Sequence, residues 1–238
     1  MSSTPSANWQ KDIAHVVHPY SNLDAHDRRG PVVITRGDGC YVEAESGKRY
    51  LEGMSGLWCA SLGFSEKRLV DAAMAQFNTL PYYHLFNHRS HPPGIALAEA
   101  LTAIAPQGLH HVLFANSGSE ANDAADTLVW YYNNQLGRPK KKKIISRING
   151  YHGVTVASGS LTGLVHVHRD FDLPIPQVLH TDCPSHYHFA QPDETEAQFA
   201  ERLANNLEQM ILREGPDTVA AFIAEPINGS GGVIVPPA

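Results

Sequence analysis

The sequence contains little cysteine, no excess of basic residues and no long apolar run. It has three cysteines, widely spaced and odd in number, which argues against the disulfide framework of a secreted protein. The net charge of −6 argues against nucleic acid or an anionic membrane as a partner. No stretch reaches the roughly 18 apolar residues of a membrane span, and residues 1–8 lack the apolar core of a signal peptide. These absences predict a soluble, cytoplasmic protein with no nucleic-acid and no membrane partner.

Hydropathy patterns in the remaining sequence predict an α/β fold. Residues 32–51 alternate short strand-like runs with turn signals, which predicts a small antiparallel meander, whereas we expect residues 15–29 to be irregular. The predicted helices cover residues 66–77, 94–105, 118–136 and 194–214, and the predicted strands cover residues 144–146 and 219–224. Helices that alternate with short apolar strands indicate a mostly parallel sheet with flanking helices, preceded by a small β-rich N-terminal segment. We therefore expect an N-terminal segment over 1–60 and a larger domain over 61–238.

Residues 114–123, which read FANSGSEAND, are the most informative stretch. Ser117 and Glu120 have the spacing of a capping box that starts a helix, and Gly118 permits the close approach of a ligand. The first N–H groups of a helix have no intrahelical partner and carry a partial positive charge. This stretch therefore predicts an anion cradle for a phosphate group. The alternative is a capped helix start with no ligand.

Tyr151 lies between Gly150 and the His152-Gly153 pair, directly after a predicted strand. Its ring could stack on a flat cofactor, or it could be an aromatic residue packed in a loop. Glu225 follows the strand predicted over 219–224. Ligands of parallel sheets bind beyond the carboxyl ends of the strands, so we expect the phosphate cradle, Tyr151 and Glu225 to lie at the same edge. A phosphate anchor combined with a stacking ring suits pyridoxal phosphate.

These segments together resemble those of the class III aminotransferases, which are enzymes of fold type I that depend on pyridoxal 5'-phosphate (PLP). The resemblance extends from about Asp24 to the end of the chain. The matching motifs lie at residues 37–39, 47–51, 56–58, 116–123, 150–153 and 224–226.

The resemblance implies a role for four residues in cofactor binding. Gly118 and Ser119 would hold the phosphate, and Tyr151 would stack on the pyridine ring. Glu225 would lie beside the cofactor and help to hold the acidic partner of the pyridine nitrogen, or its surroundings.

The resemblance also implies a substrate pocket in a homodimer whose active site lies at the subunit interface. Leu57, Trp58 and Val154 would line this pocket, and Phe86 would reach in from the partner subunit. The alternative for Trp58 and Phe86 is an ordinary core position. Ser230 lies where members with a glutamate switch carry an acid, which favours the branch of ω-transaminases that resembles amine:pyruvate and β-alanine:pyruvate transaminases.

The chain departs from the family at residues that the chemistry needs. The lysine that forms a Schiff base with PLP and the Asp that pairs with the pyridine nitrogen both lie, in the family, downstream of the region that matches here. We therefore expect an N-terminal portion that lacks the C-terminal part of the large domain and the small domain, and that is inactive alone. The whole enzyme would transfer an amino group from an amine or ω-amino acid to a keto acid such as pyruvate. The alternatives are a mutase or decarboxylase on the same scaffold, or a non-catalytic fragment that serves as an assembly module.

Fourteen histidines require a check for metal sites. Two pairs, His166/His168 and His186/His188, could be ligand pairs on strands, and another pair at residues 84 and 88 could share a helix face. No set of Cys, Asp and Glu completes a recognisable site around them, so we predict no metal.

Overall fold

The structure is a computed structural model that describes residues 5–237. Residues 1–4 of the polar N-terminal stretch and Ala238 lie outside the described residues. The chain forms two compact units, of which the first ends at Leu97 and the second begins at Ala98. The boundary predicted after residue 60 separates an N-terminal segment from the cofactor-binding domain of the whole protein. The two compact units do not test this boundary, so it stays a prediction.

The first unit begins with two helices, α1 (Ala7–His15) and α2 (Leu23–Arg29). Each is started by a side-chain cap, since Ser6 Oγ accepts from the N–H of Trp9 at 3.1 Å and Asn22 Oδ1 accepts from the N–H of Ala25 at 2.8 Å. The prediction of irregular structure over residues 15–29 was therefore wrong for α2, which is specified by its cap and not by apolar periodicity.

The predicted antiparallel meander is confirmed. Strands β1 (Ile34–Asp38), β2 (Tyr41–Ala44) and β3 (Arg49–Leu51) form a three-stranded sheet in the order β1-β2-β3. Val42 and Ala44 are its buried side chains, two residues apart on one face of β2.

Three further helices complete the first unit or cross its boundary: α3 (Ser55–Trp58), α4 (Lys67–Thr79) and α5 (Pro92–Ile104). The predicted helices over 66–77 and 94–105 are confirmed. The predicted helix face for His84 and His88 was wrong, because both residues lie in the irregular segment between α4 and α5.

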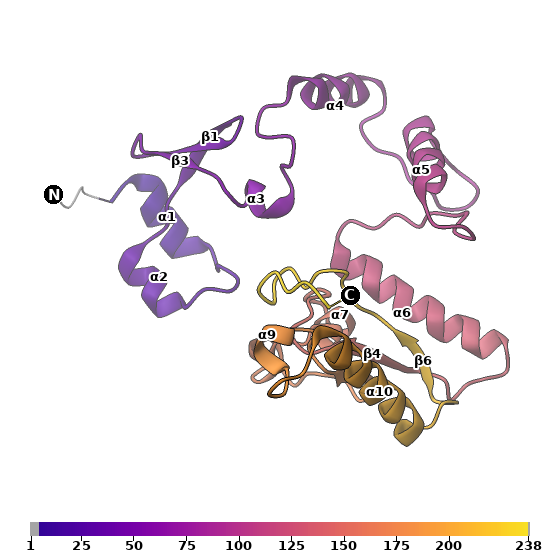
Figure 1. Cartoon of the computed structure of the whole chain (residues 1–238). Helices are drawn as coiled ribbons and strands as arrows, with labels where there is room; N and C mark the ends of the chain where they lie inside the picture. Colours follow the sequence, from indigo (N-terminus) through magenta and orange to yellow (C-terminus); the bar gives the residue numbers. More distant parts are fainter. Residues whose placement is uncertain (1–4, 238) are drawn as a thin grey trace. The chain divides into compact units, whose positions relative to one another are not determined.

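The second unit contains the parallel sheet (Figure 1). Strands β4 (Lys143–Arg147), β5 (Val178–Thr181) and β6 (Val219–Phe222) are parallel, with β4 in the centre. The helices of this unit are α6 (Gly118–Gln135), α7 (Val156–Leu161), α8 (Val165–His168), α9 (His186–Phe189) and α10 (Glu196–Glu214). Helix α6 contacts β6, α7 contacts β4 and β5, and α10 contacts β5. The predicted helices over 118–136 and 194–214 and both predicted strands are confirmed.

The core of this unit forms between the sheet and α7. Ile144, Leu161 and Val178 are buried there, with Ile175 and Ile223 packed against them. None of the described helices is both long and apolar enough to cross a membrane.

The histidine pairs of this unit do not lie on strands, which corrects a second expectation. His166 and His168 lie in α8, and His186 and His188 lie in α9.

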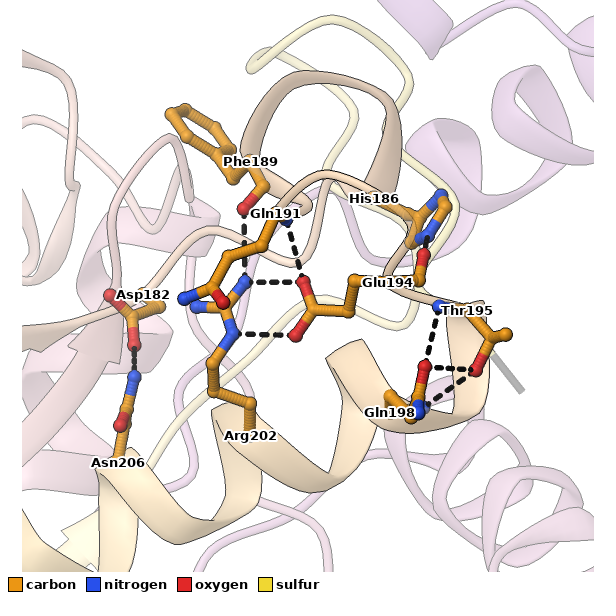
Figure 2. Close-up of polar contacts among 9 residues, drawn as sticks. All are labelled: Asp182, His186, Phe189, Gln191, Glu194, Thr195, Gln198, Arg202 and Asn206. Carbon is orange, nitrogen blue, oxygen red and sulfur yellow. Dashed lines mark hydrogen bonds and ion pairs between the residues drawn. The ribbon is translucent and has the colours of Figure 1, made fainter.

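A charged pair fastens α10 to the segment before it (Figure 2). Arg202 Nε and Nη2 donate to the two carboxylate oxygens of Glu194 at 2.7 and 2.8 Å, and Nη2 also donates to the carbonyl of Phe189 at 3.0 Å. The hydrogen bond from Arg202 is the main cause that lowers the pKa of Glu194 to about 2. A capping box formed by Thr195 and Gln198 begins the helix itself.

Candidate functional site

Helix α6 begins as the sequence predicts. Ser117 Oγ accepts from the N–H of Glu120 at 3.2 Å, and Glu120 Oε2 accepts from the N–H of Asn116 at 3.0 Å. The glutamate of the predicted capping box therefore reaches one residue before the N-cap. The N–H groups of Gly118 and Ser119 have no hydrogen-bond partner within the helix, because they belong to its first turn. They therefore form the positive end of the helix dipole.

The Ser119 side chain is oriented by a residue 35 positions away. The N–H of Val154 donates to Ser119 Oγ at 3.1 Å, so this hydroxyl oxygen already accepts a bond and its own proton can be donated to an anion. A Cβ placed on Gly118 would meet no atom within 4 Å, which means that open space lies beside the first residue of the helix. The start of α6 thus offers two backbone N–H groups, one hydroxyl proton and room for a ligand.

The segment that carries Tyr151 is held against α6 by side chains that bond to its backbone. Asn122 Nδ2 donates to the carbonyl of His152 at 2.6 Å. Thr162 Oγ1, which is fully buried, accepts from the N–H groups of His152 and Gly153 at 2.9 and 3.2 Å. These bonds satisfy buried backbone groups and give the segment one conformation.

Gly153 allows this close packing. Its φ of +136° is a backbone conformation that side chains disfavour. A Cβ at this position would lie 2.3 Å from Ser158 Oγ and 2.6 Å from Ser119 Oγ. A larger residue would therefore displace the hydroxyl that the cradle uses.

Glu225 joins this segment to the chain that follows β6. Its Oε2 accepts from the N–H of Tyr151 at 2.8 Å, and its Oε1 accepts from the N–H of Gly229 at 3.0 Å. The contact follows from the parallel pairing of β4 and β6, which brings both carboxyl ends to the same edge of the sheet. Side chains from two directions therefore hold the backbone of residues 151–154. Glu225 accepts from the N–H of Tyr151, and Ser119 accepts from the N–H of Val154.

Burial shifts the pKa of two groups in this region. Burial lowers the pKa of His152, and the charge of Glu225 opposes this shift only in part. The His152 Nε2 atom is buried and has no partner among the described residues. Burial also raises the pKa of Asp126 on α6 to about 6, with a smaller contribution from the charge of Asp123.

The predicted substrate-pocket residues are exposed side chains. Val154 is exposed beside Ser119, whereas Leu57, Trp58 and Phe86 lie in the first unit. The alternative that Trp58 and Phe86 are core residues does not hold within this chain, since they are 60% and 76% exposed. Leu57 and Trp58 have φ values of +60° and +65°, a left-handed backbone conformation that is costly for residues other than glycine. Such strain is often found at functional sites.

Two pockets among the described residues are lined by residues that take no part in the hydrogen bonds around residues 151–154. One is lined by residues of the meander, and the other, of about 200 Å³, is lined by Ile148, Asp182, Cys183, Phe189, Arg202 and Leu203. Neither contains a predicted site residue.

The side chains that hold the site in place, Asn122 and Thr162, were not among the residues predicted from the sequence. Asn122 lies within the recognised motif, so its position was a usable signal. Thr162 was not predictable, because its role depends on a backbone contact made only in the folded chain.

Comparison with known proteins agrees with the fold and the motifs. The family model described as aminotransferase class-III matches residues 23–238. The chain is 57% identical over 234 residues to vanillin aminotransferase of Capsicum chinense, covering 98% of this chain and 48% of that protein. It is 55% identical over 219 residues to the mitochondrial gamma-aminobutyrate transaminase 1 of Oryza sativa subsp. japonica, covering 92% of this chain and 42% of that protein.

Solved structures of the omega transaminase from Pseudomonas jessenii are also similar. Its complex with PMP superposes with a TM-score of 0.95 at 59% identity, covering 99% of this chain and 51% of that chain. The W58G variant of the thermostable omega transaminase PjTA-R6, engineered for asymmetric synthesis of enantiopure bulky amines, also superposes, with a TM-score of 0.96 at 59% identity, covering 97% of this chain and 51% of that chain.

The chain spans about half the length of the relatives it matches. The chain has the fold of the PLP-dependent transferases of fold type I. This follows from its parallel sheet with flanking helices and from its close superposition on solved transaminases. The chain belongs to the class III aminotransferases, a family of PLP-dependent enzymes.

Proposed function

We propose that the protein containing this chain is an aminotransferase that moves an amino group from an amine or ω-amino acid to a keto acid such as pyruvate. The relatives named as gamma-aminobutyrate transaminase, vanillin aminotransferase and omega transaminase support this reaction class. The observation that carries the proposal is the start of α6, where Ser119 is oriented by Val154 with its proton available to an anion.

The donor set at this site fits the phosphate of PLP. The N–H groups of Gly118 and Ser119 and the Ser119 hydroxyl are the donors that a phosphate requires, and the space beside Gly118 is open. When bound, PLP supplies an electron sink that stabilises negative charge on the substrate carbon.

Tyr151 and Glu225 would act by orienting the cofactor. In this proposal the Tyr151 ring packs on the pyridine, and the bond from its N–H to Glu225 keeps the ring-bearing segment in place. Fixed positions for the phosphate and the ring would hold the substrate at a constant angle to the reacting group.

Leu57, Trp58, Val154 and, from a partner subunit, Phe86 would form the substrate pocket. The exposure of these apolar side chains in the chain supports such a role, because a site shared by two subunits leaves its lining open in each. The W58G variant of the omega transaminase PjTA-R6, which was engineered for synthesis of bulky amines, supports a role of Trp58 in limiting substrate size.

We propose a homodimer in the cytoplasm. The many exposed large apolar side chains support a subunit interface, and the three free cysteines suit a reducing compartment. Light scattering of the whole protein and its localisation by cell fractionation test these two points.

An assay of the whole protein with PLP tests the reaction. We expect alanine to form from pyruvate in equal amount to the amine consumed. We expect Tyr151→Ala to lower the rate strongly, while Tyr151→Phe retains most of it because the phenyl ring still stacks. Release of carbon dioxide, or migration of the amino group within the substrate, without alanine formation would refute amino transfer in favour of a decarboxylase or mutase.

A further inference from the structure

Three side chains of the first unit converge on one point. Asp12 lies on α1, His18 on the connection after it and His26 on α2. Asp12 Oδ1 lies 2.8 Å from His18 Nε2 and 3.0 Å from His26 Nε2. One ligand atom from each residue lies within 4.8 Å of the other two, and all three residues are half-buried.

This arrangement is close to that of a metal-ligand set. Two imidazoles and one carboxylate are ligands that zinc accepts, at about 2.0–2.1 Å from the metal. Tetrahedral geometry at that distance places ligand atoms about 3.3 Å apart. The observed separations of 2.8 and 3.0 Å would therefore need to widen by only a few tenths of an ångström.

The orientation of the two imidazole rings also suits a cation. Both rings direct Nε2 toward the same oxygen, with centroids 4.1 Å apart. A metal would replace the two N–H protons that now bridge the nitrogens to the carboxylate.

We propose that Asp12, His18 and His26 bind one divalent transition cation of the zinc class, which fastens α1 to α2. The prediction of no metal rested on histidines two or four residues apart, whereas the spacing of Asp12, His18 and His26 along the chain follows no common motif. The role is structural, because the site ties together two short helices, neither of which has a buried residue. This site does not depend on the proposed function.

Cobalt titration of the chain after treatment with EDTA tests the site. We expect one equivalent of Co²⁺ to produce the visible absorption of a tetrahedral complex, and Zn²⁺ to displace it. Asp12→Asn and His18→Gln should lose this equivalent, whereas His15→Gln should keep it, since His15 is an exposed residue at the end of the same helix. Cobalt absorption that is absent in the wild type, or equal in wild type, Asp12→Asn and His18→Gln, would overturn the proposal.

A cysteine variant separates metal binding from hydrogen bonding and from loss of folding. In His26→Cys the thiolate can bind a metal but cannot replace the imidazole N–H bond to Asp12. We expect this variant to keep one equivalent of Co²⁺ and to gain a sulfur-to-cobalt charge-transfer band. If the three residues form only a hydrogen-bonded cluster, His26→Cys binds no cobalt and Zn²⁺ leaves the unfolding midpoint of the wild type unchanged.

Discussion

Asp126 is a buried carboxyl that should make the stability of the chain fall as the pH rises. It lies on α6 with 6% of its surface exposed. Burial, together with the charge of Asp123, raises the pKa of its carboxyl from 3.8 to about 6. The folded chain therefore holds this proton more tightly than the unfolded chain does.

The sign and size of the effect follow from this difference. Below about pH 4 the carboxyl is protonated in both states and has no effect on the free energy of unfolding. Stability is lost as the pH rises from about 4 to about 6, because only the unfolded chain then ionises freely. The shift from 3.8 to about 6 corresponds to roughly 3 kcal/mol, at about 1.4 kcal/mol per pH unit.

The substitution Asp126→Asn removes the ionisation and keeps the shape of the side chain. We expect the variant to match the wild type near pH 4 and to exceed its free energy of unfolding by up to about 3 kcal/mol above pH 7. Urea unfolding followed by circular dichroism across this pH range measures the free energy of unfolding of both proteins. The contributions of the other titrating groups cancel when the wild-type value is subtracted from that of the variant.

Asp217→Asn is the matched control, because Asp217 is exposed in the turn before β6. We expect Asp217→Asn to stay close to the wild type in free energy of unfolding above pH 7, where Asp126→Asn exceeds it. An Asp126→Asn difference that is equally large at both ends of the pH range would refute the reasoning.

Three further substitutions test local features of the fold. Gly153→Ala should lower the free energy of unfolding in urea by more than Gly232→Ala does. Both glycines have a positive φ (+136° and +121°), but only at Gly153 do atoms lie within 4 Å of the added Cβ. Equal losses would contradict the contact argument. Arg202→Met should raise the pKa of Glu194 from about 2 toward 4.5 in an NMR titration. The variant should lose the stability that the wild type has above pH 4.5 and loses as the pH falls toward 2. An unchanged pKa would show that Arg202 does not cause the low pKa of Glu194. Leu57→Gly should raise stability by up to about 1 kcal/mol by relieving a φ of +60°, and a lower unfolding midpoint would contradict strain at this position.

Regular structure with strong apolar periodicity was predictable from the sequence. The segment over 194–214 repeats apolar residues at helical spacing, and it forms α10. The apolar runs at Ile144 and Val219 form β4 and β6, and their parallel pairing explains why Glu225 meets Tyr151. Contacts that depend only on strand order could thus be anticipated.

Elements held by single polar contacts were not predictable in the same way. Helix α2 lacks an apolar face that a periodicity search could find, and it depends on the Asn22 cap and on the contact between His26 and Asp12. The bond from Asn122 to the carbonyl of His152 joins residues 30 positions apart. Such bonds are formed by the folded chain and leave no local pattern in the sequence.

The affinity of the whole protein for PLP tests the central claim that the start of α6 holds the cofactor phosphate. Ser119→Ala removes the hydroxyl that Val154 orients, and the loss of one charge-assisted hydrogen bond should weaken PLP binding about tenfold or more. Thr127→Ala, an exposed position further along the same helix, should leave the dissociation constant unchanged. A dissociation constant in Ser119→Ala equal to that of the wild type would contradict the account.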